Sequence, residues 1–319
     1  MGCDEISPRI LKGCASSLTV PIYMIVKKSI EVDQLPIIWK QANVTPIYKG
    51  GSKLEAVNYR PVSLTSIPCK IAEAVIVGNI NNHMLTNDLF CKKQYGFMRN
   101  RSCTGNLLEA QDAISTWVNE GFDVDVKYTD FSKAFDRVSH PKLLRKLKFY
   151  GIEGPILNWI TNFLSDRKQR VTLGNDVSDW CDVTSGIAQG SKIGPLCFNI
   201  FINDLPHMLR NLILLYADDS KIIVKLTDDE LLNNTLQEDL NRLNNYCDKW
   251  SMKLNPDKCR VIHYKAKRNS NNIDMEYYLF NADGIHNKIQ KSELERDLGI
   301  MISSDLKWKH QTSHAINKA

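Results

Sequence analysis

Long hydrophobic runs, Cys-x-x-Cys pairs and internal repeats are all missing from this chain of 319 residues. The longest apolar runs, such as 212–216, are far too short to span a bilayer. Acidic residues at positions 4 and 5 exclude a secretory signal, so we expect no membrane partner. The nine scattered cysteines fit neither a disulfide framework nor a zinc site, and they indicate reduced thiols in an intracellular protein.

A strong excess of one charge is also missing. Lys plus Arg outnumber Asp plus Glu by 41 to 36, giving a net charge of +5, which permits a polyanionic partner without requiring one. The composition is that of a globular protein, with 43% hydrophobic and 24% charged residues. Disordered and collagen-like classes are therefore excluded.

Helical and strand-like segments are mixed along the chain, which predicts an α+β fold. Ser7 and Pro8 resemble the start of a helix, and Pro21 is expected to divide the first thirty residues into two helices. Strands are expected at 44–48, 60–64 and 170–173, and further helices at 70–85, 102–119, 142–150, 155–164 and 194–205.

Three segments have clearer patterns. Residues 122–130 alternate between apolar and polar, which predicts a half-buried strand. The apolar runs 212–216 and 222–224 flank acidic residues, which predicts a β-hairpin. A helix is expected over 227–250, with a capping box formed by Thr227 and Glu230. Its apolar stripe is expected to lie in the core and consists of Leu232, Leu236, Leu240, Leu243, Cys247 and Trp250.

Acidic residues end the predicted strand and occupy the hairpin turn. If the two elements are neighbours in one antiparallel sheet, Asp130, Asp218 and Asp219 converge at one edge. Clustered carboxylates repel one another unless a cation neutralises them, and such oxygens suit Mg²⁺. Asp is also common in turns and at helix caps, so these residues alone leave a structural reading open.

A set of motifs in one order favours the metal site. Residues 129–140, TDFSKAFDRVSH, resemble motif A of the reverse transcriptases of non-LTR (LINE-like, jockey-type) retrotransposons, and 216–219, YADD, is similar to motif C. Residues 185–199 resemble motif B, but they depart from it at Ala188, where proline is usual, and at Lys192, where a small apolar residue is common. Further matches to family motifs lie at 58–64, 94–97, 254–259 and 297–300, followed by Trp308.

The resemblance implies a right-hand polymerase fold, in which fingers and palm (an antiparallel sheet backed by helices) precede a partial thumb. It implies a reverse transcriptase domain over 30–302, a helical N-terminal extension over 1–29 and the start of a truncated thumb over 303–319. The fingers would cover roughly 30–120 and part of 150–190, and the palm roughly 121–149 and 191–262.

The resemblance also implies RNA-directed DNA polymerase activity, a nucleotidyl transfer from a dNTP to a primer 3′-hydroxyl. Asp130, Asp218 and Asp219 would hold two Mg²⁺ ions, with Mn²⁺ as an alternative, and Lys258 would protonate the leaving pyrophosphate. The implied partners are an RNA template, a DNA primer and the dNTP.

Other residues are implied to bind the substrates. Phe135 would act as a steric gate against the ribose 2′-hydroxyl, although without the resemblance packed core is the more common explanation of such a phenylalanine. The nucleotide-binding set consists of Lys49, Arg60, Phe131, Ala134, Phe135, Gln189 and Gly190. The set that contacts nucleic acid consists of Arg99, Arg101 and Lys192.

The family usually has an endonuclease domain before the polymerase and a fuller thumb after it, so this chain resembles a fragment of an element. Three other hypotheses remain: an RNA-dependent RNA polymerase, a two-metal nuclease, and an inactive remnant that at most binds nucleic acid.

Overall fold

The computed structural model describes every residue except 1, 228, 230–233, 267–274, 281–285 and 319. The chain forms two compact units, each built from two stretches of sequence. The first unit contains residues 1–90 and 135–201, and the second contains 91–134 and 202–319. The predicted limits of fingers, palm and thumb stay a prediction. Among the described residues, no helix is long and apolar enough to cross a membrane.

The first unit contains a sheet in which the strand order is β2-β1-β4, with two short strands paired to β4. Strands β1 (Gln41–Tyr48) and β2 (Tyr59–Leu64) form an antiparallel pair, and β4 (Arg167–Leu173) lies parallel to β1. The short strands are β5 (Asp176–Val177) and β6 (Cys181–Val183). The three strands expected in this unit are therefore confirmed.

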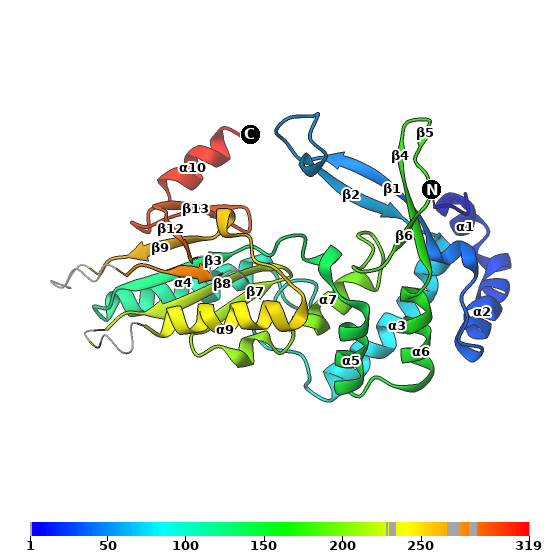
Figure 1. Ribbon diagram of the computed structural model, residues 1–319, viewed down its shortest axis with the longest axis horizontal. Coiled ribbons are helices and arrows are strands. Elements are labelled where there is room, and N and C mark those ends of the chain that lie inside the picture. Colours follow the sequence, from blue (N-terminus) through cyan, green and yellow to red (C-terminus); the bar gives the residue numbers. More distant parts are fainter. Residues whose placement is uncertain (1, 228, 230–233, 267–274, 281–285, 319) are drawn as a thin grey trace. The chain divides into compact units, whose positions relative to one another are not determined.

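Figure 1 shows the α-helices of the first unit. They are α1 (Pro8–Gly13), α2 (Ala15–Glu31), α3 (Ile67–Thr86), α5 (His140–Phe149), α6 (Gly154–Leu164) and α7 (Gly194–Ile202). The expected break at Pro21 was wrong, since Pro21 lies inside α2 and the break falls at Cys14. An internal proline removes one backbone hydrogen bond of the helix, and α2 continues despite that loss.

The second unit is built on a five-stranded sheet of order β12-β9-β3-β8-β7. Its strands are β3 (Val124–Thr129), β7 (Leu212–Tyr216), β8 (Asp219–Lys225), β9 (Arg260–Tyr264) and β12 (Gln290–Lys291). Strand β3 is central and pairs antiparallel with both β8 and β9, and β7 pairs with β8 as a hairpin. The hairpin predicted over 212–224 is therefore confirmed.

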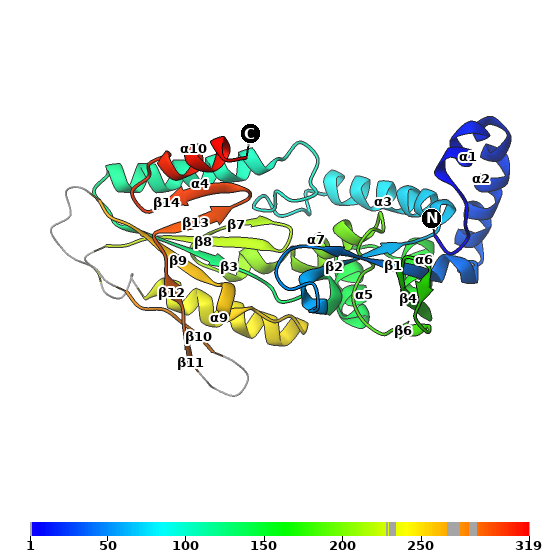
Figure 2. The same cartoon turned by 90° about the horizontal axis from the view of Figure 1, so that it is seen from above.

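Helices α4 (Cys103–Asn119) and α9 (Thr235–Trp250) lie on opposite faces of this sheet (Figures 1 and 2). Val124 and Val126 of β3 belong to a buried cluster that includes Ile114 of α4. The alternate side chains of β3 are buried as well, since Asp125 is 1% exposed and Lys127 is 0% exposed. The expectation of a half-buried strand was therefore wrong, because a helix covers each face.

Two buried carboxylates, Asp125 of β3 and Asp123 just before this strand, have hydrogen-bond partners within the unit. Asp125 accepts hydrogen bonds at 2.7 Å from the His263 ring and at 2.5 Å from the Tyr277 hydroxyl. Asp123 accepts one from the main-chain N–H of Ala266 at 2.8 Å. These contacts offset part of the cost of burying two carboxylates.

Helix α9 is anchored to the chain that enters β7. Its stripe residues Leu236, Leu240 and Leu243 are at most 1% exposed, which confirms them as core. The predicted capping box includes Glu230 and the stripe begins at Leu232, and both residues lie outside the described part of the chain.

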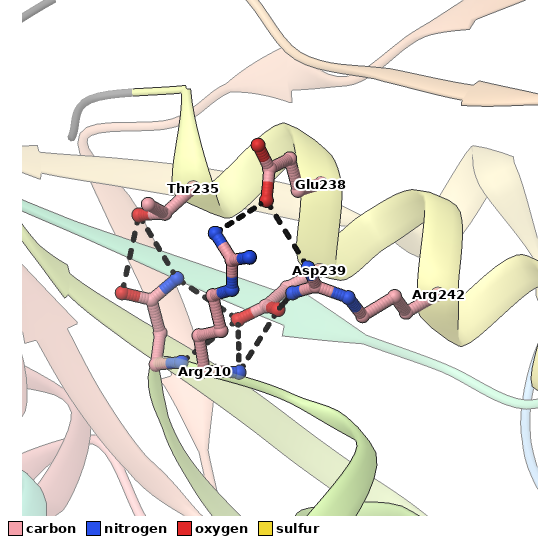
Figure 3. A network of polar contacts seen from close by, with 6 residues as sticks. Arg210, Thr235, Glu238, Asp239 and Arg242 are labelled. Carbon is pink, nitrogen blue, oxygen red and sulfur yellow. Dashed lines mark hydrogen bonds and ion pairs between the residues drawn. The ribbon is translucent and has the colours of Figure 1, made fainter. Parts of the chain in front are cut away.

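A buried carboxylate makes this anchor (Figure 3). Asp239 of α9 accepts hydrogen bonds from the main-chain N–H groups of Arg210, at 3.0 and 3.1 Å, and of Asn211, at 2.8 Å. Arg242 pairs with the same carboxylate at 2.7 Å. The network fixes the start of the strand that leads to Asp218.

The remaining elements of the second unit follow β9. They are the hairpins β10 (Tyr278–Phe280) with β11 (His286–Lys288) and β13 (Leu294–Asp297) with β14 (Ile300–Ser303), and the helix α10 (Lys309–Ile316). A buried ion pair between Lys221 of β8 and Asp297 links the β13–β14 hairpin to the central sheet.

Candidate active site

Strand register brings the acidic residues to one edge of the β3–β8–β7 sheet. Thr129, the last residue of β3, pairs with Ser220, and its hydroxyl donates to the Ser220 carbonyl at 3.1 Å. Asp130 therefore leaves β3 beside the start of β8, where Asp219 pairs with Tyr216 to close the hairpin. Asp218 lies in the two-residue turn between β7 and β8.

The charges at this edge perturb one another. Desolvation, together with the negative charges of Asp218 and Asp130, raises the pKa of Asp219 to about 6. A cation bound among these carboxylates would relieve the repulsion that raises this pKa. The arrangement therefore fits a divalent metal ion, and the ligand chemistry, all carboxylate oxygen, suits Mg²⁺ or Mn²⁺.

A pocket of about 190 Å³ opens beside the acidic residues. Asp130, Asp219 and Lys258 line it, together with Glu295–Leu298, which form the end of β13 and the start of the following turn. In the described part of the chain, no group of three or more His, Cys, Asp or Glu side chains is arranged to hold a metal ion. Mg²⁺ commonly takes few protein carboxylates and completes its shell with water and substrate phosphates.

The sequence placed Lys258 at the same site, and the structure locates its ammonium 3.4 Å from a carboxylate oxygen of Asp130. The Lys258 side chain is 67% exposed, so this ion pair is screened by water and adds little stability. Lys258 is therefore available to a substrate that reaches Asp130.

Two motif A residues of the predicted nucleotide-binding set, Phe131 and Ala134, face inward. Phe131 and Ala134 are each 4% exposed, and Phe131 forms a bridge with Leu254. Their side chains therefore pack within the protein, and a contact with the nucleotide would have to come from their main chain.

In the first unit, the motif B turn packs closely against the main chain of β2. Gly190 has φ +116, and a Cβ atom there would lie 2.7 Å from the Ser63 carbonyl oxygen. The main-chain N–H of Ser63 donates to the Gln189 carbonyl at 2.7 Å. The Gln189 side chain donates to Asp136 at 3.3 Å. Any other residue at 190 would push the turn away from β2.

Phe135, the predicted steric gate, is half-buried and stacks on Phe198. The ring centroids are 4.6 Å apart and the planes are inclined by 22°. Packing therefore fixes the orientation of the Phe135 ring while part of it stays accessible. The geometry agrees with both readings of this residue, the gate and the core side chain.

The cations predicted to bind the triphosphate lie at the outer end of the β1–β2 hairpin. Lys49 follows β1 directly, and its main-chain N–H donates to the Asn58 carbonyl at 2.8 Å. Arg60 is paired with Ile47 in the hairpin ladder. Both side chains are exposed.

The residues predicted to contact nucleic acid differ in their surroundings. Arg99 and Lys192 are exposed. The Arg101 guanidinium donates to the carbonyls of Lys92 and Gln94 and lies 5.1 Å from the centre of the Tyr95 ring. Arg101 therefore stabilises its own loop, which leaves Arg99 better placed for a phosphate.

Sequence reasoning missed Glu73, a residue of α3 that holds the motif B turn. Its carboxylate is 0% exposed and accepts hydrogen bonds from the main-chain N–H groups of Lys192, at 2.6 Å, and Ile193, at 3.0 Å. These groups precede the N-terminus of α7, where a negative charge is stabilised. Nothing in the sequence around Glu73 signals this partner, which is 119 residues away.

With the site described, comparison with known proteins defines its class. A family model described as reverse transcriptase (RNA-dependent DNA polymerase) matches residues 47–299. The chain belongs to this family. The match spans the residues predicted for metal and nucleotide binding, from Lys49 to Lys258.

The particular relatives come from mobile elements. The chain is 29% identical, over 81% of its length, to a probable RNA-directed DNA polymerase from transposon BS of Drosophila melanogaster. It is 28% identical, over 84% of its length, to the RNA-directed DNA polymerase from mobile element jockey of the same species. The matches cover 29% and 30% of those two proteins, so the chain spans less than a third of their length.

A solved structure supports the fold. Apo telomerase from Candida tropicalis, truncated from its C-terminal domain, matches with a TM-score of 0.54 and 12% sequence identity. The match covers 89% of this chain and 58% of the telomerase chain. The predicted right-hand polymerase fold, an α+β fold with sheets backed by helices, is confirmed.

Proposed function

We propose that this chain is the polymerase part of a non-LTR retrotransposon protein and extends a DNA primer on an RNA template with dNTPs. The observation that carries the proposal is the convergence of Asp130 and Asp219 on one pocket beside the turn that contains Asp218. Family membership and the relatives from mobile elements support the same activity.

In this proposal the acidic residues hold two divalent cations, Mg²⁺ or Mn²⁺. When bound, such ions activate an attacking hydroxyl and stabilise a leaving phosphate oxygen. Asp130 and Asp218 are the proposed principal ligands, and the raised pKa of Asp219 agrees with a third carboxylate that joins them when a cation is present. Lys258 would donate a proton to the departing pyrophosphate, since its ammonium already lies at Asp130.

The first unit would supply the nucleotide contacts. Arg60 offers a planar fork to two phosphate oxygens and Lys49 a mobile positive charge. Gln189 and Gly190 would line the nucleotide pocket, and the Phe135 ring would exclude a ribose 2′-hydroxyl, the group that distinguishes RNA from DNA. In the second unit, the main chain of Phe131 and Ala134 would contact the nucleotide. Arg99, Arg101 and Lys192 are the residues proposed to contact the template, and Arg99 is the more accessible arginine.

A primer-extension assay tests the proposal. The folded chain, a DNA primer on an RNA template, Mg²⁺ and dNTPs should give extended primer, and Asp218→Asn should abolish the extension. As a matched control, Asp112→Asn changes an exposed aspartate of α4 and should leave the extension unchanged.

Three results would overturn the proposal. Equal use of NTPs and dNTPs would indicate an RNA-dependent RNA polymerase. Metal-dependent cleavage of the strands without extension would indicate a nuclease. Salt-sensitive RNA binding by a folded chain that extends no primer would indicate an inactive remnant.

A further inference from the structure

The turn that contains Asp218 has an unfavourable backbone conformation. Ala217 has φ +53, in the left-handed region, and Asp218 does not share it. A two-residue hairpin turn with a positive φ only at its first position usually has glycine there, because a Cβ atom makes the conformation costly. Alanine is therefore strained at this position, and its neighbour in sequence is a proposed metal ligand.

One buried side chain contacts this turn from a distant part of the sequence. The side-chain oxygen of Gln94 accepts a hydrogen bond from the main-chain N–H of Ala217 at 2.9 Å. The same oxygen accepts a second bond from the N–H of Gly96 at 2.8 Å. Gln94 is 3% exposed and Ala217 is 5% exposed, so water does not replace either contact easily.

The segment around Gln94 is held against β7 by main-chain hydrogen bonds. The N–H of Tyr95 donates to the Leu215 carbonyl at 2.8 Å, and the N–H of Leu215 donates to the Lys93 carbonyl at 2.9 Å. Gly96 lies so close that a Cβ atom there would be 2.3 Å from the Ala217 nitrogen. The segment 93–96 therefore presents the Gln94 oxygen to the turn at a fixed position.

A simpler explanation is that Gln94 only satisfies a buried N–H group. That explanation gives no reason for the strained alanine to keep its conformation. Strained residues persist where the surrounding structure holds them, and the hydrogen bond from Ala217 to Gln94 acts at the strained residue itself. Because Asp218 is bonded to Ala217, a change in this conformation would move the carboxylate.

We propose that Gln94 is a positioning residue for Asp218, and that it acts by holding Ala217 in the left-handed conformation. This inference rests on the proposed polymerase function. Gln94 touches no reacting group and sets the geometry of the metal site through the β7–β8 turn.

The test compares Gln94→Met, which keeps the length of the side chain and removes the acceptor, with Gln94→Met combined with Ala217→Gly. Gln94→Met should lower kcat about 100-fold, because a displacement near 1 Å costs that much, and should change KM for dNTP less than threefold. The added glycine removes the strain, so the double variant should have a kcat at least about tenfold higher than that of Gln94→Met alone. Ile114→Val, a core change in the same unit, is the control and should leave kcat unchanged.

Hydrogen exchange supplies a measurement that does not depend on activity. In Gln94→Met the amide of Ala217 should exchange at least about tenfold faster, while the amide of Ile223 in the centre of β8 keeps its wild-type rate. Two results would overturn the role of Gln94: unchanged exchange at Ala217, or a loss of kcat no larger than that of Ile114→Val. Absence of extension by the wild-type chain would instead overturn the proposed function, so the two failures are read from different measurements.

Discussion

The two units hold their proposed functional residues by different means. In the second unit, Asp130 directly follows β3 and Asp219 is the first residue of β8. The pairing of Thr129 with Ser220 between these strands therefore sets the separation of the two carboxylates. In the first unit, Lys49 and Arg60 are exposed at the end of a hairpin. The sheet therefore fixes the positions of two proposed metal ligands, whereas the proposed phosphate contacts are side chains open to solvent.

The largest expected effect lies in the second unit. Asp130→Asn should lower kcat about a thousandfold, equivalent to about 4 kcal/mol, because the amide removes a charge that holds the cation. Single-turnover primer extension measures the change. A loss of less than tenfold would show that Asp130 is not a metal ligand, and it would contradict the proposed difference between the two units.

A smaller effect is expected in the first unit. Arg60→Ala should raise KM for dNTP about tenfold, through loss of a charge-assisted phosphate contact, and should change kcat little. Lys53→Ala removes an exposed cation from the loop of the same hairpin and should leave KM unchanged. Equal changes in both variants would show a general effect of positive charge instead of a specific contact.

Phe135→Ala combines a loss of selectivity with a loss of packing. Removal of the ring should relax the rejection of ribonucleotides, and loss of the stack on Phe198 should lower the free energy of unfolding by about 2 kcal/mol. Phe198→Leu removes the stack and keeps the Phe135 ring, so it should lower stability and retain more of the selectivity for dNTP than Phe135→Ala does. If both variants lose selectivity in proportion to stability, Phe135 is a core residue only.

The smallest expected effect concerns the stability of the second unit. The hydrogen bond to Asp125 is the main reason that the pKa of His263 lies above its ordinary value of 6.5. This contact is therefore fully present below pH 6.5, and its contribution is lost as the pH rises through the raised pKa of the folded state. Wild type should exceed His263→Gln in free energy of unfolding by about 1 kcal/mol at pH 5.5 and by less at pH 9. A difference that stays constant with pH would contradict this account.

Elements that depend on a local pattern of apolar and polar residues could be predicted from the sequence. The hairpin over 212–224 followed from two apolar runs around acidic residues, and its pairing with β3 placed Asp130 beside it. The break at Cys14 in place of Pro21 shows the opposite case, since an internal proline weakens a helix without always ending it.

Burial and hydrogen bonds that depend on residues far apart in the sequence were not predicted. Asp125 and Lys127 read as the solvent side of a strand, and they are buried because a helix more than a hundred residues later covers that face. Glu73 and Gln94 act on turns 119 and 123 residues away, and no short spacing in a single sequence records such pairs.

In the proposed function, Asp130 and the β7–β8 turn form one metal site. The most direct test is to count bound Mn²⁺ by electron paramagnetic resonance, with template, primer and a non-reactive dNTP analogue present. The wild-type complex should bind two ions tightly, and both Asp130→Asn and Asp218→Asn should lose tight binding. Wild-type Mn²⁺ binding in either variant would contradict this proposal.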